Sequence, residues 1–280
     1  MFFQLYWQYF FAGLILWVVI KIVFNFKKNR FSDDKKERYE QLEGEFELKG
    51  YREIQPALPK DLKHVLLNWT KIPIEESLNR SKEFYKIMAK RRTVRHFSKE
   101  DVPKEIIENI IRTAGTSPSG AHTEPWTFVV IHNNKKKQKI REIIEEEEEI
   151  NYKKRMGTTW TTDLQPLRTN WIKEYITDAP YLILVFKQTY SSKSDGSKKL
   201  HYYNDQSISI ATGILLAAIQ IAGLVTLTST PLNCGPALRN LLRRPKSEKL
   251  VFLLPVGYPA KDCSVPNLYR KPLDDIMVEF

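Results

Sequence analysis

Two short stretches say most about this chain: Arg91-Arg92-Thr93-Val94-Arg95 and Ser117-Pro118-Ser119-Gly120-Ala121-His122. The planar arginine fork suits a phosphate group that accepts two parallel hydrogen bonds, and a Pro-Ser-Gly-Ala turn lets backbone N–H groups approach a flat ligand. Together the two stretches indicate a bound ligand that carries phosphate. A solvated basic surface is the alternative at this point, because the chain contains 44 Lys and Arg residues.

Helix and strand signals alternate along the chain from Ser81 onward. Pro103 is placed to open a helix with an isoleucine face, and Gly115 is placed to end it. Strands are predicted over 126–131, 181–187, 225–230 and 250–257, and further helices over 135–156 and 203–222. This order of elements predicts an α/β or α+β domain in which helices wrap a sheet.

The N-terminal segment has a different character. Residues 1–26 are nearly all apolar or aromatic, with Gln4, Gln8 and Lys21 as the main interruptions, and the segment is long enough to cross a bilayer. We predict a single transmembrane anchor, because a cleaved signal peptide would need a basic start and a small-residue cleavage site. The basic flank at 27–30 predicts that the remaining chain is cytosolic, at the plasma membrane or an intracellular vesicle membrane.

Residues 27–80 are rich in Lys, Glu and Asp and contain only short apolar patches. Such a composition does not bury enough surface to offset the entropy of ordering the chain. We therefore interpret 27–80 as a charged juxtamembrane spacer or arm. Residues 81–280 are predicted to form one catalytic domain, which is long enough for a substantial core.

Charge and cysteine content narrow the function classes. The formal net charge is +11, but zinc spacings, a basic helix-turn-helix and an aromatic RNA-binding signature are all missing, so no nucleic-acid partner is expected. Cys234 and Cys263 are the only cysteines and show no metal-binding spacing, which predicts ordinary thiols in a reducing compartment and no metal site. No Gly-x-Gly-x-x-Gly motif supports direct nicotinamide binding.

From Ser81 to Phe280 the chain resembles the iodotyrosine deiodinases, a family of nitroreductase-like flavoproteins. The resemblance rests on the two stretches quoted above, the second extended to Trp126, and on the runs 145–156, 170–175 and 231–236. It implies an α+β fold with a central mixed sheet wrapped by helices. It also implies an intertwined homodimer whose active sites are shared between the subunits.

The cofactor implied by the resemblance is flavin mononucleotide (FMN). Its implied contacts are Arg91, Arg92, Thr93, Arg95, Pro118, Ser119, Gly120, Thr228, Ser229, Thr230 and Arg270. Those in the turn would come from the partner subunit. Thr230 is the implied catalytic residue, because a hydroxyl that donates to flavin N5 favours electrons leaving singly rather than as hydride. Without the resemblance, a strand threonine would be assigned to packing.

The substrate contacts implied by the resemblance are Ala121, Glu148, Tyr152 and Lys173. Glu148 and Tyr152 are four residues apart and so share one face of a helix. Periodicity alone favours a solvated face here. The resemblance implies instead that Glu148 binds the ammonium and Lys173 the carboxylate of an amino acid under a closing lid, while the Ala121 N–H faces a phenolate oxygen.

The implied reaction is reductive dehalogenation of 3-iodotyrosine and 3,5-diiodotyrosine to tyrosine and iodide. Electrons would leave the reduced flavin in single steps, and a separate NADPH-linked donor would resupply them. Two alternatives stay open: a general nitro or quinone reductase that uses NAD(P)H, and a membrane-tethered scaffold without enzymatic activity. Trp160 and Trp171 are expected in the core, and His96, His122 and His132 are assigned no role.

Overall fold

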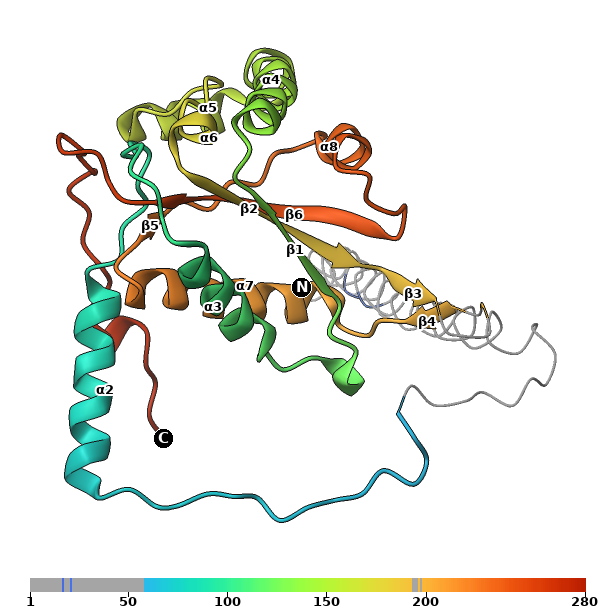
Figure 1. Ribbon diagram of the computed structural model, residues 1–280. Coiled ribbons are helices and arrows are strands. Elements are labelled where there is room, and N and C mark those ends of the chain that lie inside the picture. The colour runs from blue at the N-terminus through green and yellow to red at the C-terminus, as the bar shows by residue number, and fades with distance from the viewer. Residues whose placement is uncertain (1–16, 18–20, 22–57, 193–195, 197) are drawn as a thin grey trace, which may run out of the picture. The chain divides into compact units, whose positions relative to one another are not determined.

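In the part of the chain that the structure describes, four strands form the central sheet and helices cover both of its faces (Figure 1). The computed structural model describes residues 58–192, 196 and 198–280, together with Trp17 and Lys21. Along the sheet the order is β1 (Trp126–Ile131), β2 (Tyr181–Gln188), β6 (Glu248–Gly257) and β5 (Val225–Thr226). Neighbouring strands pair antiparallel, and a parallel bridge between Thr93 and Thr226 makes the sheet mixed.

Strand β2 lies inside the sheet and is buried on both faces, which explains its continuous apolar sequence. Successive side chains of a strand point to opposite faces. Leu182 and Leu184 accordingly pack into one core cluster, whereas Ile183 and Val185 pack into the other. The predicted strand over 181–187 is confirmed, and it separates two hydrophobic layers.

One face of the sheet is covered by α3 (Lys104–Gly115) and α7 (Asn204–Ile221). The other face carries α4 (Asn134–Ile150), α6 (Tyr175–Asp178) and α8 (Gly235–Leu241), with α5 (Thr158–Leu164) on the same side (Figure 1). The isoleucine face predicted for α3 is confirmed by burial of Ile107 and Ile110. These layers give the expected α+β arrangement its core.

Two predicted elements end earlier than the sequence indicated. The helix expected over 135–156 is α-helical only to Ile150, and Asn151–Arg155 form a π-helical turn, η2, closed by a 2.7 Å hydrogen bond from the Met156 N–H to the Asn151 carbonyl. The strand expected over 225–230 ends at Thr226. Beyond it the segment returns to the sheet at Ser229, which exchanges two backbone hydrogen bonds with Leu253.

Smaller elements complete the described chain. A hairpin of β3 (Tyr190–Ser192) and β4 (Lys198–Leu200) lies outside the central sheet, and short 3₁₀ turns form η1 (Gly120–His122), η3 (Gln165–Leu167) and η4 (Leu273–Asp275). Helix α2 (Ile74–Ala89) begins inside the segment predicted as a spacer, and none of its residues is buried. The described residues from 58 to 280 belong to one compact unit.

No helix in the described part of the chain combines the length and apolar character that a membrane crossing requires. The predicted anchor, residues 1–26, lies outside the described residues except for Trp17 and Lys21. Most of the predicted spacer, up to residue 57, lies outside them as well.

Candidate active site

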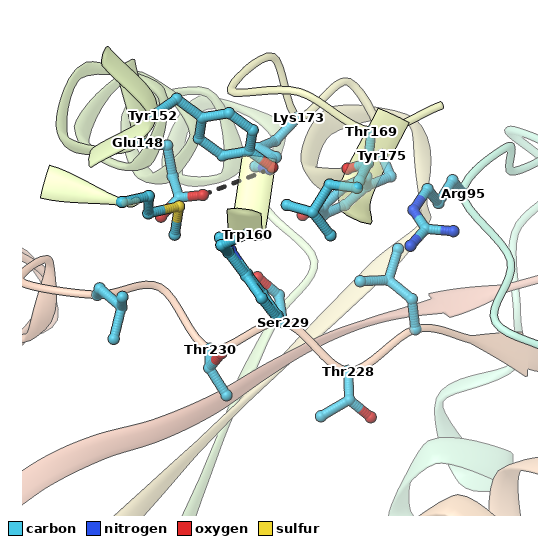
Figure 2. A pocket seen from close by; sticks show the side chains of 14 residues that line it. Arg95, Glu148, Tyr152, Trp160, Thr169, Lys173, Tyr175, Thr228, Ser229 and Thr230 are labelled. Atoms are coloured by element: carbon cyan, nitrogen blue, oxygen red, sulfur yellow. Dashed lines mark ion pairs between the residues drawn. The ribbon is translucent and has the colours of Figure 1, made fainter. Parts of the chain in front are cut away.

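A pocket of about 370 Å³ lies where the end of α4 and the segment after it cover the chain that follows β5. It is lined by Arg95, Glu148, Tyr152, Met156, Trp160, Leu164, Thr169, Lys173, Tyr175, Leu227, Thr228, Ser229, Thr230 and Leu232. Figure 2 shows the charged residues of the α4 side facing the threonine and serine side chains across the pocket. Seven residues predicted for the site therefore meet here: Arg95, Glu148, Tyr152, Lys173, Thr228, Ser229 and Thr230.

A buried ion pair occupies the α4 wall of the pocket. Lys173 Nζ lies 3.5 Å from Glu148 Oε2, and the two side chains are only 7% and 9% exposed. Burial lowers the pKa of Lys173, and the neighbouring Glu148 carboxylate opposes that shift. Lys173 Nζ also donates to the Asn170 carbonyl. One positive and one negative group thus face the same cavity with few other partners, as recognition of a zwitterion requires.

Tyr152 adds an aromatic surface to this wall. Its ring lies 5.2 Å from Lys173 Nζ, and it meets the Trp171 ring edge-on at 6.1 Å between centroids. Burial raises the pKa of the Tyr152 hydroxyl, which interacts with Thr169. The phenol therefore stays protonated near neutral pH and can donate a hydrogen bond into the pocket.

The opposite wall is the segment Thr228–Thr230. The arginine-rich stretch is fastened to the same part of the sheet, because the Val94 N–H donates to the Thr226 carbonyl at 3.1 Å. This pairing brings Arg95 to the pocket alongside Thr228 (Figure 2). Two segments that are far apart in the sequence thereby form one polar edge.

Among the described residues, Arg91, Arg92 and Arg270 form a cluster that has no carboxylate partner. Arg270 Nη2 donates to the Arg91 carbonyl at 3.1 Å, and Arg92 donates to the Pro266 carbonyl. Burial lowers the pKa of Arg91, and the positive charges of Arg270 and Arg92 lower it further. Within the described residues, none of these three guanidinium groups forms an ion pair with a carboxylate. Such uncompensated positive charge fits a phosphate monoester, which carries close to two negative charges.

The predicted turn residues do not reach this pocket: Pro118, Ser119, Gly120 and Ala121 are absent from its lining. Ser119 Oγ accepts a 3.0 Å hydrogen bond from the Glu124 N–H, so this hydroxyl shapes its own turn. A Cβ at Gly120 would lie 3.0 Å from the Tyr202 carbonyl oxygen, so the close approach at this glycine is to its own chain. Ala121 has a left-handed backbone with φ of 49°. Thr93 also lies outside the pocket lining.

Sequence reasoning missed three residues of the site. Tyr175 is buried, its pKa is raised by burial to about 12, and its hydroxyl interacts with Ser229. Asn151 contacts the Glu148 carboxylate. Trp160 was expected in the core, but it lines the pocket and is 53% exposed. Only Asn151, three residues after Glu148, carried a local signal, since residues at that spacing are neighbours on a helix.

The profile of the nitroreductase family matches residues 88–258, which is more than half of the chain. An iodotyrosine deiodinase of Hydra vulgaris is 69% identical over 206 residues, covering 74% of this chain and 76% of the relative. Iodotyrosine deiodinase 1 of Mus musculus is 54% identical over 273 residues, covering 95% and 94%.

Among solved structures, an oxidised iodotyrosine deiodinase bound to FMN and 3-iodo-L-tyrosine superposes with a TM-score of 0.61 at 31% identity. The match covers 70% of this chain and 98% of that one. The superposition therefore takes in nearly all of a protein that holds a flavin and a halogenated tyrosine together.

Proposed function

This chain belongs to the nitroreductase family and, within it, to the iodotyrosine deiodinases, and on that basis we propose that it reductively removes iodide from 3-iodotyrosine and 3,5-diiodotyrosine with FMN as its cofactor. The observation that carries the proposal is the buried Glu148–Lys173 pair facing Thr228–Thr230 across one pocket. A general nitro or quinone reductase does not need a buried carboxylate and ammonium to bind its substrate. A tethered scaffold has no need of the pocket.

The residues present fit FMN. Arg91, Arg92 and Arg270 would hold its phosphate, because their charges are otherwise uncompensated among the described residues. Arg95 and the segment Thr228–Thr230 would border its ring. Bound flavin supplies two electrons, which together with one proton replace the carbon–iodine bond by a carbon–hydrogen bond and release iodide.

The chain's own residues bind and orient the amino acid. Glu148 would bind the substrate ammonium and Lys173 its carboxylate. The substrate ammonium would then replace Lys173 as the partner of Glu148, and the substrate carboxylate would replace Glu148 as the partner of Lys173. The Tyr152 hydroxyl, kept protonated by burial, would donate to the substrate carboxylate. With both ends of the amino acid held, its phenol ring is confined to the space in front of Thr228–Thr230, and water is displaced from that space.

Thr230 is the proposed donor to the flavin ring, and the neighbouring Ser229 side chain interacts with the Tyr175 hydroxyl. The Tyr175 hydroxyl has a pKa of about 12, so this contact stays neutral over the working pH range. A fixed neutral donor at this edge favours electron transfer in single steps.

We propose that the working form is a homodimer. Helix α2 buries none of its residues, and large apolar side chains lie exposed at Leu66, Trp69, Met277 and Phe280. Surfaces of this kind are typical of subunit interfaces. In the dimer, residues 118–121 of one subunit would complete the pocket of the other, since they do not line the pocket of their own chain.

We further propose that residues 1–26 anchor the enzyme in a membrane with its catalytic domain in the cytosol, at the plasma membrane or an intracellular vesicle. The basic flank at 27–30 supports this orientation. A separate NADPH-linked protein would supply the electrons, because the sequence contains no dinucleotide-binding fingerprint. Protease protection of sealed vesicles would test the orientation.

The direct test of the function is anaerobic. The full-length protein would be purified with its flavin, reduced, and mixed with 3-iodotyrosine while flavin absorbance and free iodide are followed. Reoxidation of the flavin with release of one iodide per two electrons is expected. Unchanged reduced-flavin absorbance would refute the proposed function, and a colourless protein without flavin would favour the scaffold.

A further inference from the structure

Asn151 has a buried side-chain amide that lies between the end of α4 and the loop after Thr228–Thr230, the segment proposed to border the flavin. It is 1% exposed and lies in the π-helical turn η2. Its Nδ2 donates to Glu148 Oε1 at 3.3 Å and to the Leu232 carbonyl at 3.4 Å. Its Oδ1 accepts from Arg155 Nη1 at 3.1 Å and from Asn233 Nδ2 at 3.3 Å. An amide has two donors and two acceptor positions, so all four are in use.

These contacts allow one orientation of the amide. Turning it over would place Oδ1 against the Glu148 carboxylate and the amide nitrogen against the Arg155 guanidinium. Each exchange would bring together groups that repel each other in a buried site, which is costly. Asn151 therefore presents a fixed N–H to the Glu148 carboxylate.

The two oxygens of that carboxylate have different partners. Oε2 faces Lys173, whereas Oε1 is held by Asn151. Once a substrate carboxylate engages Lys173, Asn151 is the described residue that still contacts Glu148 and aims it at the substrate ammonium. Asn151 itself is not part of the pocket lining, so it acts through Glu148.

The same amide links Glu148 to the chain on the opposite side of the pocket. Leu232 and Asn233 come shortly after Thr228–Thr230 in the chain, with Pro231 between, and Leu232 lines the pocket. By bonding to both, Asn151 sets the distance between the carboxylate that grips the amino acid and the segment that borders the flavin. A positioning group of this type determines where along the cofactor a gripped substrate lies.

We propose that Asn151 is a positioning residue that makes the enzyme specific for substrates with an α-ammonium group, by aiming Glu148 and holding it at a fixed distance from the cofactor wall. This inference rests on the function proposed above. It predicts that losing the Asn151 amide weakens the recognition of one charged group of the substrate and leaves the rest of the site intact.

The test compares three ligands on the full-length, flavin-loaded protein: 3-iodotyrosine, its analogue without the amino group, and 2-iodophenol. Asn151→Leu should raise the Kd for 3-iodotyrosine by about tenfold, and the Kd for each of the other two by less than about twofold. Asn204→Leu is the matched control, since Asn204 is a half-buried amide outside the pocket that donates to the Gln188 carbonyl. A purely structural role for Asn151 would weaken all three ligands together.

A double-mutant cycle tests whether Asn151 acts on the affinity for 3-iodotyrosine through Glu148. In a Glu148→Gln background, adding Asn151→Leu should change the Kd for 3-iodotyrosine by less than about twofold, because the group that Asn151 positions is already lost. Independent effects of the two substitutions would overturn the proposal. Loss of bound flavin in both Asn151→Leu and Asn151→Ser would assign the residue to folding alone and would overturn it too.

The wild-type protein separates this inference from the proposed function. If it binds 3-iodotyrosine no better than the analogue without the amino group, the proposed binding of the substrate ammonium by Glu148 is wrong. If it prefers 3-iodotyrosine and Glu148→Gln abolishes that preference while Asn151→Leu does not, only the role of Asn151 fails.

Discussion

Removing one partner of the Glu148–Lys173 pair should lower both stability and substrate affinity. Removing both partners should restore most of the stability but none of the affinity. The charges lie 3.5 Å apart with 7% and 9% of their side chains exposed. At an effective dielectric constant of about 20, their attraction is about 5 kcal/mol, and leaving one buried charge alone costs roughly 3 to 5 kcal/mol. Glu148→Gln and Lys173→Met should each lower the free energy of unfolding by roughly 3 kcal/mol. The double variant should lose only about 1 kcal/mol, because no unpaired charge remains.

Binding should not recover in the same way. Each single variant loses one charge that grips the amino acid, so the Kd for 3-iodotyrosine should rise by roughly tenfold to a hundredfold. The double variant should bind at least as weakly as either single one. Urea unfolding of the flavin-loaded protein measures stability, and the change in flavin absorbance during titration measures the Kd. A double variant that regains affinity together with stability would refute the assignment of this pair to the substrate.

The pair also predicts a pH dependence of stability. Burial lowers the pKa of Lys173 in the folded protein below its usual value of 10.5. Between these two pKa values the unfolded chain binds more protons than the folded one, so the contribution of Lys173 to stability rises as pH rises through that window. Glu148→Gln removes the charge that opposes the shift and should extend the window to lower pH. Urea midpoints at a series of pH values, with Lys173→Met as the reference that lacks the titration, would check this.

Three other outcomes are expected. Arg270→Gln should weaken FMN binding by roughly tenfold to a hundredfold, as measured by flavin fluorescence. Urea unfolding should show that the flavin-free variant is slightly more stable, because the repulsion between Arg270 and Arg91 is gone. Tyr175→Phe should lower turnover by about tenfold and FMN affinity by less than about twofold, because it frees Ser229; equal losses in both would contradict this. The Cys234 thiol, with its pKa raised by burial to about 12, should react far more slowly with iodoacetamide at pH 8 than Cys263, and equal labelling in the folded protein would show the thiol is accessible.

Some features of the site were readable because their signals are local. Glu148 and Tyr152 lie four residues apart, and both line the pocket even though α4 changes to a π-helical turn between them. The arginine-rich stretch predicted a phosphate site, and the unpaired cluster at Arg91 is consistent with that prediction. The inner strand β2 was found because a strand buried on both faces must be apolar throughout.

The sequence by itself determined that helices wrap a sheet, that 181–187 is an apolar strand, and which types of charged group are available to a cofactor and an amino acid, because periodicity and residue chemistry are properties of neighbouring positions. Only the tertiary structure decided which of those groups meet. It paired Glu148 with Lys173 across 24 intervening positions in sequence, set Tyr175 against Ser229, and used Asn151 to join α4 to the loop after Thr230. Such contacts follow from how the sheet and its covering helices pack, and burial then gives each contact its strength, which no local pattern encodes.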